Sequence, residues 1–145
     1  TIGRVFEGTG CVSNLTVMEN ITLSRLHYSG KDEAALIEMA RETACTLGLG
    51  DIPDDRPDSV PARDLRMAQW VRALMGSPRL VVIEDPEKGV HAKDKALLIG
   101  AVEKAAKEGS AVLWWTSSQA GIECGAESVR HFIFRNGTLK AQGEA

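Results

Sequence analysis

The sequence predicts an α/β fold in which helices cover a short parallel sheet. The first observation is the continuous apolar run from Leu80 to Ile83, which is rich in β-branched residues and is bounded by Pro78 and Pro86. Such a run is typical of a strand that is buried on both faces. The second observation is the alternation of strand and helix patterns after this run, and the third is the mostly helical pattern before it. We therefore expect the Leu80 strand at the centre of the sheet.

Composition places the chain among globular proteins. Its 145 residues are enough for one compact domain with a real core, and 43% of them are hydrophobic against 26% charged. The net charge of −3 excludes the basic surfaces that attract nucleic acid or an anionic membrane. Cys11, Cys45 and Cys124 are odd in number and lack the spacing of metal ligands, which predicts reduced thiols in a cytosolic protein. The chain begins with Thr1 and no apolar run reaches transmembrane length, so we expect a fragment or a processed chain without a membrane span.

The first half predicts one strand and three helices. Thr16 and Glu19 form a capping-box pattern, which marks a helix start, and Gly48 and Gly76 are natural helix stops. The linker before the third helix holds three prolines and four aspartates, which excludes a long regular element. The expected elements are a strand at Ile2–Phe6, helices at about 16–26, Asp32–Leu47 and Ala62–Met75, and a linker at Gly50–Pro61. The apolar stripe expected on the third helix consists of Leu65, Ala68, Val71, Leu74 and Met75.

The second half predicts an alternation of strands and helices that ends in a hairpin. Asn136-Gly137 is the strongest short hairpin signal. We expect Ala111–Thr116 to be a buried strand, in which Trp114 joins the core and Trp115 packs under a helix, or the reverse. The other expected elements are a helix at Ala92–Lys107, a short helix at Gln119–Glu127, and hairpin strands at Phe132–Phe134 and Thr138–Ala141.

Two acids, Glu84 and Asp85, follow the Leu80 strand directly. In open α/β sheets, ligands bind at the carboxyl ends of the strands. One carboxylate there can hold a metal ion with its water, and the other can orient an attacking water. The alternative is a pair of solvated acids that only end a core strand.

Taken in order, these segments resemble the nucleotide-binding domain of ABC transporters, from just before its Q-loop to its C-terminal hairpin. The resemblance covers nearly all of the chain and depends on the order and spacing of several motifs. It implies a P-loop-NTPase-like parallel sheet with a helical subdomain, that is, a partial ABC ATPase fold without the Walker A region. The matching segments are Ile2–Glu7 (Q-loop strand), Asn14–Ile21 (start of the helical subdomain), Leu65–Leu74 (helix after the signature sequence), Ser77–Pro86 (Walker B) and Asn136–Gly137 with Gln142–Gly143 (terminal hairpin).

The family's catalytic motifs are altered at every matching position. The sequence contains no Gly-x-x-x-x-Gly-Lys-Ser/Thr loop, which a truncation before Thr1 would explain. Glu7 stands at the Q-loop glutamine, His91 at the D-loop aspartate, and Ser117 at the switch histidine. The signature Leu-Ser-Gly-Gly-Gln is replaced by Val60, Pro61, Ala62, Arg63 and Asp64. Pro61 removes a donor, and Arg63, which can attract phosphate by charge, is opposed by its neighbour Asp64.

Walker B also ends in reversed order. By resemblance, Glu84 is the metal ligand and Asp85 is the general base, but Asp85 is shorter than the family's glutamate by roughly 1.5 Å. Misplacement on that scale can cost on the order of a hundredfold in rate. A serine at position 117 cannot carry the charge or the proton of a histidine. These changes together predict little or no ATP hydrolysis.

The resemblance implies a subunit that binds ATP and Mg²⁺ and acts with a membrane permease, as a peripheral protein on the cytoplasmic face of the cell membrane. The permease would contact residues from Glu7 to Leu15 and the helices after them. The expected further partner is a second nucleotide-binding subunit or another copy of the chain; no nucleic acid is expected. The alternative is a pseudo-ATPase, a non-enzymatic interaction module that keeps the shape. We expect two parts: residues 1–76, with the Q-loop strand and helical subdomain, and residues 77–145, with Walker B and the C-terminal hairpin.

Overall fold

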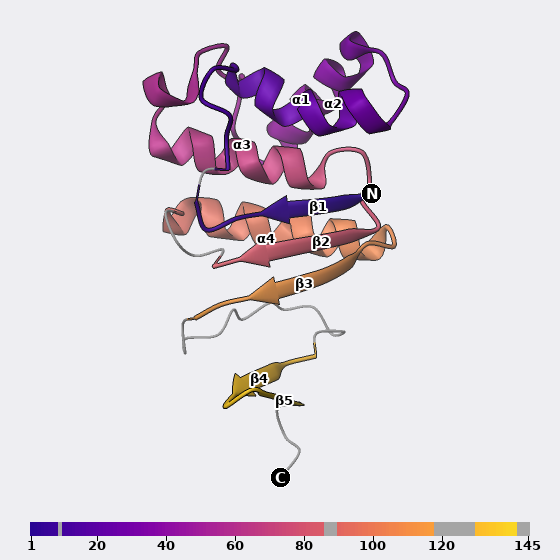
Figure 1. Ribbon diagram of the computed structural model, residues 1–145, viewed down its shortest axis with the longest axis vertical. Coiled ribbons are helices and arrows are strands. Elements are labelled where there is room, and N and C mark those ends of the chain that lie inside the picture. Colours follow the sequence, from indigo (N-terminus) through magenta and orange to yellow (C-terminus); the bar gives the residue numbers. More distant parts are fainter. Residues whose placement is uncertain (9, 86–89, 118–129, 142–145) are drawn as a thin grey trace.

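A parallel sheet of three strands lies at the centre of the molecule (Figure 1). The computed structural model describes residues 1–8, 10–85, 90–117 and 130–141. The strand order is β1 (Ile2–Val5), β2 (Leu80–Glu84) and β3 (Ala111–Trp115), and β2 pairs in parallel with both neighbours. The sequence-based prediction that the Leu80 segment is the inner strand is therefore confirmed.

In the described ranges, four helices pack beside β1 and on one face of the sheet. Helices α1 (Val17–Tyr28), α2 (Glu33–Thr46) and α3 (Ala62–Leu74) form a layer beside β1, and α4 (Ala92–Lys107) connects β2 to β3 (Figure 1). The linker before α3 contains one short 3₁₀ turn, Pro57–Ser59. The predicted capping box opens α1: the Thr16 hydroxyl accepts from the Glu19 amide at 3.2 Å, and the Glu19 carboxylate accepts from the Thr16 amide at 2.7 Å. All four predicted helices in the described ranges are present.

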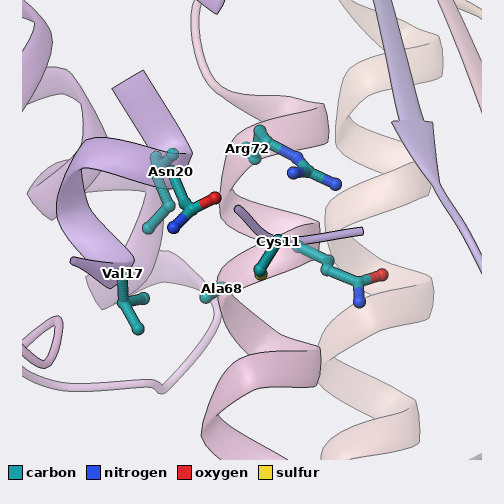
Figure 2. A pocket seen from close by; sticks show the side chains of 7 residues that line it. Cys11, Val17, Asn20, Ala68 and Arg72 are labelled. Atoms are coloured by element: carbon teal, nitrogen blue, oxygen red, sulfur yellow. The ribbon is translucent and has the colours of Figure 1, made fainter. Parts of the chain in front are cut away.

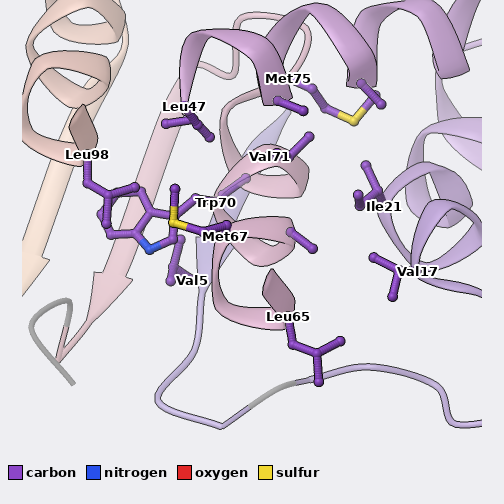
Figure 3. Packing of buried hydrophobic residues seen from close by; sticks show 14 of the residues in the cluster. Val5, Val17, Ile21, Leu47, Leu65, Met67, Trp70, Val71, Met75 and Leu98 are labelled. Atoms are coloured by element: carbon purple, nitrogen blue, oxygen red, sulfur yellow. The ribbon is translucent and has the colours of Figure 1, made fainter. Parts of the chain in front are cut away.

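Helix α3 is the centre of the core rather than an amphipathic cover. Met67 and Trp70 point toward Leu98 of α4, whereas Val71 lies on the side of Ile21 from α1 (Figure 3). The predicted apolar stripe of α3 therefore contains too few residues, because every residue from 65 to 71 is buried. Leu74, which the stripe included, is only half-buried. The reason is that α3 packs against β1, α1, α2 and α4 at once.

The contact between α3 and β1 is direct backbone contact. A Cβ atom added at Gly3 would lie 1.9 Å from the carbonyl oxygen of Ala73. No side chain fits there, so glycine is required by close approach rather than by an unusual φ angle.

The prediction that the β3 segment is buried throughout is wrong. Trp114 is half-buried and makes an edge-to-face contact with Trp70, with ring centroids 6.1 Å apart. Leu113 and Trp115 point to the opposite face and are 59% and 54% exposed. Helices α3 and α4 cover the face of the sheet that carries Val5, Ile83 and Trp114, and no helix in the described ranges buries the other face.

The predicted hairpin is confirmed. β4 (Phe132–Arg135) and β5 (Thr138–Ala141) pair in antiparallel fashion, and Asn136 and Gly137 both have positive φ angles, as the tight turn requires. The predicted helix at Gln119–Glu127 lies outside the described residues, as do Pro86 and Gln142–Gly143 of the motif matches.

Candidate functional site

The carboxyl ends of the three parallel strands meet at one edge of the sheet, and Asp85 lies at its centre. The Asp85 amide donates to the carbonyl of Trp115 at 2.9 Å, which joins the ends of β2 and β3. The Asp85 Oδ1 atom accepts from the amide and the hydroxyl of Ser117, at 2.8 and 2.9 Å. Asp85 itself has a φ of 39°, in the left-handed region that favours glycine. Two of the sequence-predicted site residues, Asp85 and Ser117, are thus in direct contact.

Glu84 points to a different partner. Its carboxylate lies 3.7 Å from the guanidinium of Arg4 on β1, and both side chains are partly exposed. The same guanidinium lies over the ring of Phe6, 4.5 Å from its centroid. Because this ion pair is solvated, it is weak, and a stronger ligand can displace Arg4 from Glu84.

A buried arginine of α3 lies beneath this edge. Arg66, only 6% exposed, donates to the carbonyls of Glu84 and Asp85 at 3.3 and 3.0 Å, and also to the carbonyl of Phe6 at the end of β1. Burial lowers the pKa of Arg66, while the charges of Asp85 and Glu7 act in the opposite direction. Sequence reasoning missed Arg66 because it treated the polar positions of this helix as solvent-facing.

The signature-position residues form the start of α3. Val60 is buried, Pro61 is the N-cap without a side-chain capping bond, and Ala62 is the first helical residue. Arg63 contacts its neighbour Asp64 at 3.0 Å, the residue expected to oppose its charge. It also forms a two-pronged ion pair with Asp94 of α4, with Nε–Oδ2 and Nη2–Oδ1 distances of 2.8 and 2.7 Å. The charge of Arg63 is therefore already matched inside the chain.

The remaining predicted residues lie at the margins of this edge. Glu7 is exposed just after β1. His91 is exposed at the N-cap of α4 and makes no side-chain capping bond, although its carbonyl accepts from the Asp94 amide at 2.9 Å. The chain between Asp85 and Val90 lies outside the described residues.

The carboxylates of Glu84 and Asp85 suit Mg²⁺ better than they suit a metal ion that is held entirely by protein side chains. Within the described ranges, no three His, Cys, Asp or Glu side chains gather as a metal-binding group. Mg²⁺ is commonly held by one or two carboxylates together with substrate phosphates, and Glu84 and Asp85 supply carboxylates of that kind. Glu84 and Asp85 are therefore candidate ligands for such an ion, and the printed sequence contains no Gly-x-x-x-x-Gly-Lys-Ser/Thr loop beside them.

A small pocket lies away from this edge, between α1 and α3. Figure 2 shows Cys11 between Asn20 of α1 and Arg72 of α3. The Asn20 side chain is buried, and its amide nitrogen donates to three carbonyls, those of Val12, Leu15 and Thr16. Burial raises the pKa of the Cys11 thiol, against the opposing effect of Arg72. The pocket is therefore lined mainly by α1 and α3, and Cys11 lines it from the chain that leaves β1.

Comparison with curated proteins identifies relatives that are named as ATP-binding proteins. No protein-family model matches the chain. The phosphonates import ATP-binding protein PhnC 2 of Synechococcus sp. (strain JA-2-3B'a(2-13)) is 28% identical over 114 residues, which are 74% of this chain and 42% of that protein. PhnC of Bordetella parapertussis is 32% identical over 99 residues, 63% of this chain and 39% of that protein. The lipoprotein-releasing system ATP-binding protein LolD 2 of Chlorobium chlorochromatii is 27% identical over 107 residues, 74% of this chain and 44% of that protein. The chain spans less than half the length of each of these relatives.

Comparison with solved structures confirms the fold. The dimeric structure of MJ0796, described as a bacterial ABC transporter cassette, matches with a TM-score of 0.73 and 20% identity, over 81% of this chain and 53% of that one. A structure of the same cassette with ADP and Pi matches with a TM-score of 0.71 over the same shares. The predicted partial ABC ATPase fold and the resemblance to ABC ATP-binding proteins are both confirmed.

Proposed function

We propose, from its similarity to ABC transporter ATP-binding proteins, that this chain is part of an ATP-binding subunit that acts with a membrane permease. The observation that supports this most is the meeting of β2 and β3 ends, where the Walker B acid Asp85 contacts Ser117 at the switch position. The relatives named as import or lipoprotein-releasing ATP-binding proteins support the same assignment. The division into a helical part, 1–76, and a second part, 77–145, stays part of this proposal.

In this proposal Glu84 holds Mg²⁺, and Asp85 orients the attacking water. Magnesium, when bound, would neutralise charge on the phosphates of ATP. Asp85 accepts two hydrogen bonds from Ser117, which fix the position of its carboxylate. By resemblance, the positions of Glu7, His91 and the segment from Val60 to Asp64 face the nucleotide, and here each holds a different residue from the family's motif. We therefore propose weak or absent hydrolysis.

One contact favours the alternative, an interaction module without enzymatic activity. Arg63, at the signature position, is bound to Asp94, so its charge is already engaged within the chain. A phosphate group would have to compete with this internal partner. Under this alternative the chain keeps the shape of the fold and pairs with an active subunit or a second copy.

The proposed location of the chain in the cell follows from its proposed permease partner. A permease places its ATP-binding subunit on the inner face of the cell membrane, and we propose this location for the chain. None of the helices in the described ranges combines the length and apolar character that a membrane span needs. The proposed contact surface includes the segment from Glu7 to Leu15 and helix α1.

Titration with a fluorescent ATP analogue, with and without Mg²⁺, separates the two functions. Magnesium-dependent binding that is lost in Glu84→Ala, the variant of the proposed metal ligand, and kept in the surface control Asp51→Asn supports the ATP-binding subunit. No binding by the folded wild type supports the interaction module. Rapid ATP turnover that disappears in Asp85→Ala would refute the proposed loss of hydrolysis.

A further inference from the structure

Three side chains on one face of α3 donate hydrogen bonds to the chain segment that leaves β1. They are spaced three residues apart, and their acceptors are carbonyls spaced two residues apart. The pairs are Arg66 with Phe6, Gln69 with Gly8 at 2.7 Å, and Arg72 with Gly10 at 2.8 Å. Phe6, Gly8 and Gly10 are therefore each held to α3 by a side chain of that helix.

The spacing on the helix explains why one face of α3 makes all three contacts. Residues three apart on a helix share a face and advance by about 4.5 Å. Arginine and glutamine side chains are long enough to reach the Phe6, Gly8 and Gly10 carbonyls from that face.

Two of the three contacts, those of Arg66 and Gln69, are also linked to each other and, through Arg66, to the candidate site. Arg66 donates to the side-chain oxygen of Gln69 at 3.3 Å, and its second nitrogen donates to the carbonyls of Glu84 and Asp85. Gln69 is only 2% exposed. Leaving a buried polar group without its partner is costly, so the loss of one contact weakens its neighbours.

We infer that Arg66, Gln69 and Arg72 are positioning residues that act together as a clamp. The clamp fixes Phe6, Gly8 and Gly10 on α3 and sets the relative positions of the β1 and β2 ends, and with them Glu7 and Asp85. This inference goes beyond the proposed function and holds whether or not the chain binds ATP.

The thiol of Cys11 provides a native probe of this clamp. Cys11 follows the last clamped residue and lines the pocket with Gln69 and Arg72, whereas Cys45 is exposed on α2 and serves as an internal reference. In a Cys124→Ser background, the modification rates of the two thiols by iodoacetamide are measured by mass spectrometry. We expect Arg66→Met and Gln69→Ala to raise the Cys11 rate about tenfold while the Cys45 rate stays unchanged.

Two comparisons separate a clamp from general stability. Arg72→Lys keeps one donor for Gly10, so it should retain most of the slow Cys11 rate that Arg72→Met loses. Arg25→Met removes a similar contact elsewhere, since Arg25 donates to the carbonyl of Met75 at 2.6 Å. This control should lower the melting temperature without changing the ratio of the two thiol rates.

The inference is overturned if folded Gln69→Ala leaves the ratio of thiol rates unchanged, or if Arg25→Met raises it equally. Should Arg66→Met fail to fold, by circular dichroism, Gln69→Ala and the pair Arg72→Met and Arg72→Lys decide the question by the same ratio.

Discussion

Removing Arg63 from its ion pair with Asp94 should cost more stability than removing Asp94 does. The Asp94 side chain is 3% exposed, whereas that of Arg63 is 27% exposed and also contacts Asp64 at 3.0 Å. In Arg63→Met the buried carboxylate keeps its charge without its main partner. In Asp94→Asn the arginine can turn toward water and Asp64. The larger loss of stability is therefore expected from the arginine substitution.

The magnitude follows from the cost of an unpaired buried charge. Removing one partner of a fully buried pair costs about 3–5 kcal/mol, and the partial exposure of Arg63 reduces this to about 3 kcal/mol for Arg63→Met. For Asp94→Asn we expect about 1–2 kcal/mol, the scale of a charged hydrogen bond. The double variant Arg63→Met/Asp94→Leu should be more stable than Arg63→Met alone, because it no longer buries a lone charge. Urea unfolding at pH 7 measures all three free energies.

The same pair predicts a pH dependence. Hydrogen bonds from Arg63 lower the pKa of Asp94 in the folded protein below its ordinary value of about 3.9. The stability from this pair is therefore fully present above about pH 4 and is lost as the pH falls through the folded pKa. In Arg63→Met, burial instead raises the pKa of Asp94, so that variant loses stability as the pH rises. The difference between wild type and variant should grow from pH 3 to pH 7, and a constant difference would refute this account.

Substitutions at three further places, two of them with a matched comparison variant, test the packing by thermal and urea unfolding. Gly3→Ala should cost about 2–3 kcal/mol because its Cβ meets the backbone of α3, whereas Gly8→Ala, with open space around it, should be nearly neutral; equal effects would contradict the close approach. Asn20→Ala should cost about 2–3 kcal/mol because it leaves buried carbonyls without their donor; a neutral result would mean that water replaces the amide. Trp70→Ala should cost about 3–5 kcal/mol and Trp114→Ala less, since only the first is fully buried; the reverse order would place the core elsewhere.

Local patterns in the sequence predicted the elements well because each depends on near neighbours. The apolar run at Leu80–Ile83, the capping box at Thr16 and the Asn136-Gly137 turn all act within a few residues. The contacts of Arg66 and Asp94 depend on residues far away in the chain, with Phe6 and Arg63 as partners. Periodicity of apolar residues cannot reveal them, because it treats every charged position as solvent-facing.

The exposure of β3 could not be predicted for a related reason. The segment from Ala111 to Trp115 is apolar on both faces of the strand, so either face could be buried. Its composition does not show whether a neighbouring helix packs on each face. For the candidate site, the family resemblance assigned Asp85 to the general base of Walker B and Ser117 to the switch-histidine position. It did not foresee that they contact one another, or that Arg63 is bound to Asp94.

The parallel pairing of β1 with β2 has a consequence for how the chain folds. Ile2 pairs with Leu80, so the whole helical layer lies in the loop that this pairing closes, whereas β2 and β3 are joined through α4 alone. Closing the longer loop costs more chain entropy and raises the mean sequence separation of the contacts. The hydrophobic nucleus should therefore assemble around β2, α4 and β3, and the first strand of the chain should be the last to dock.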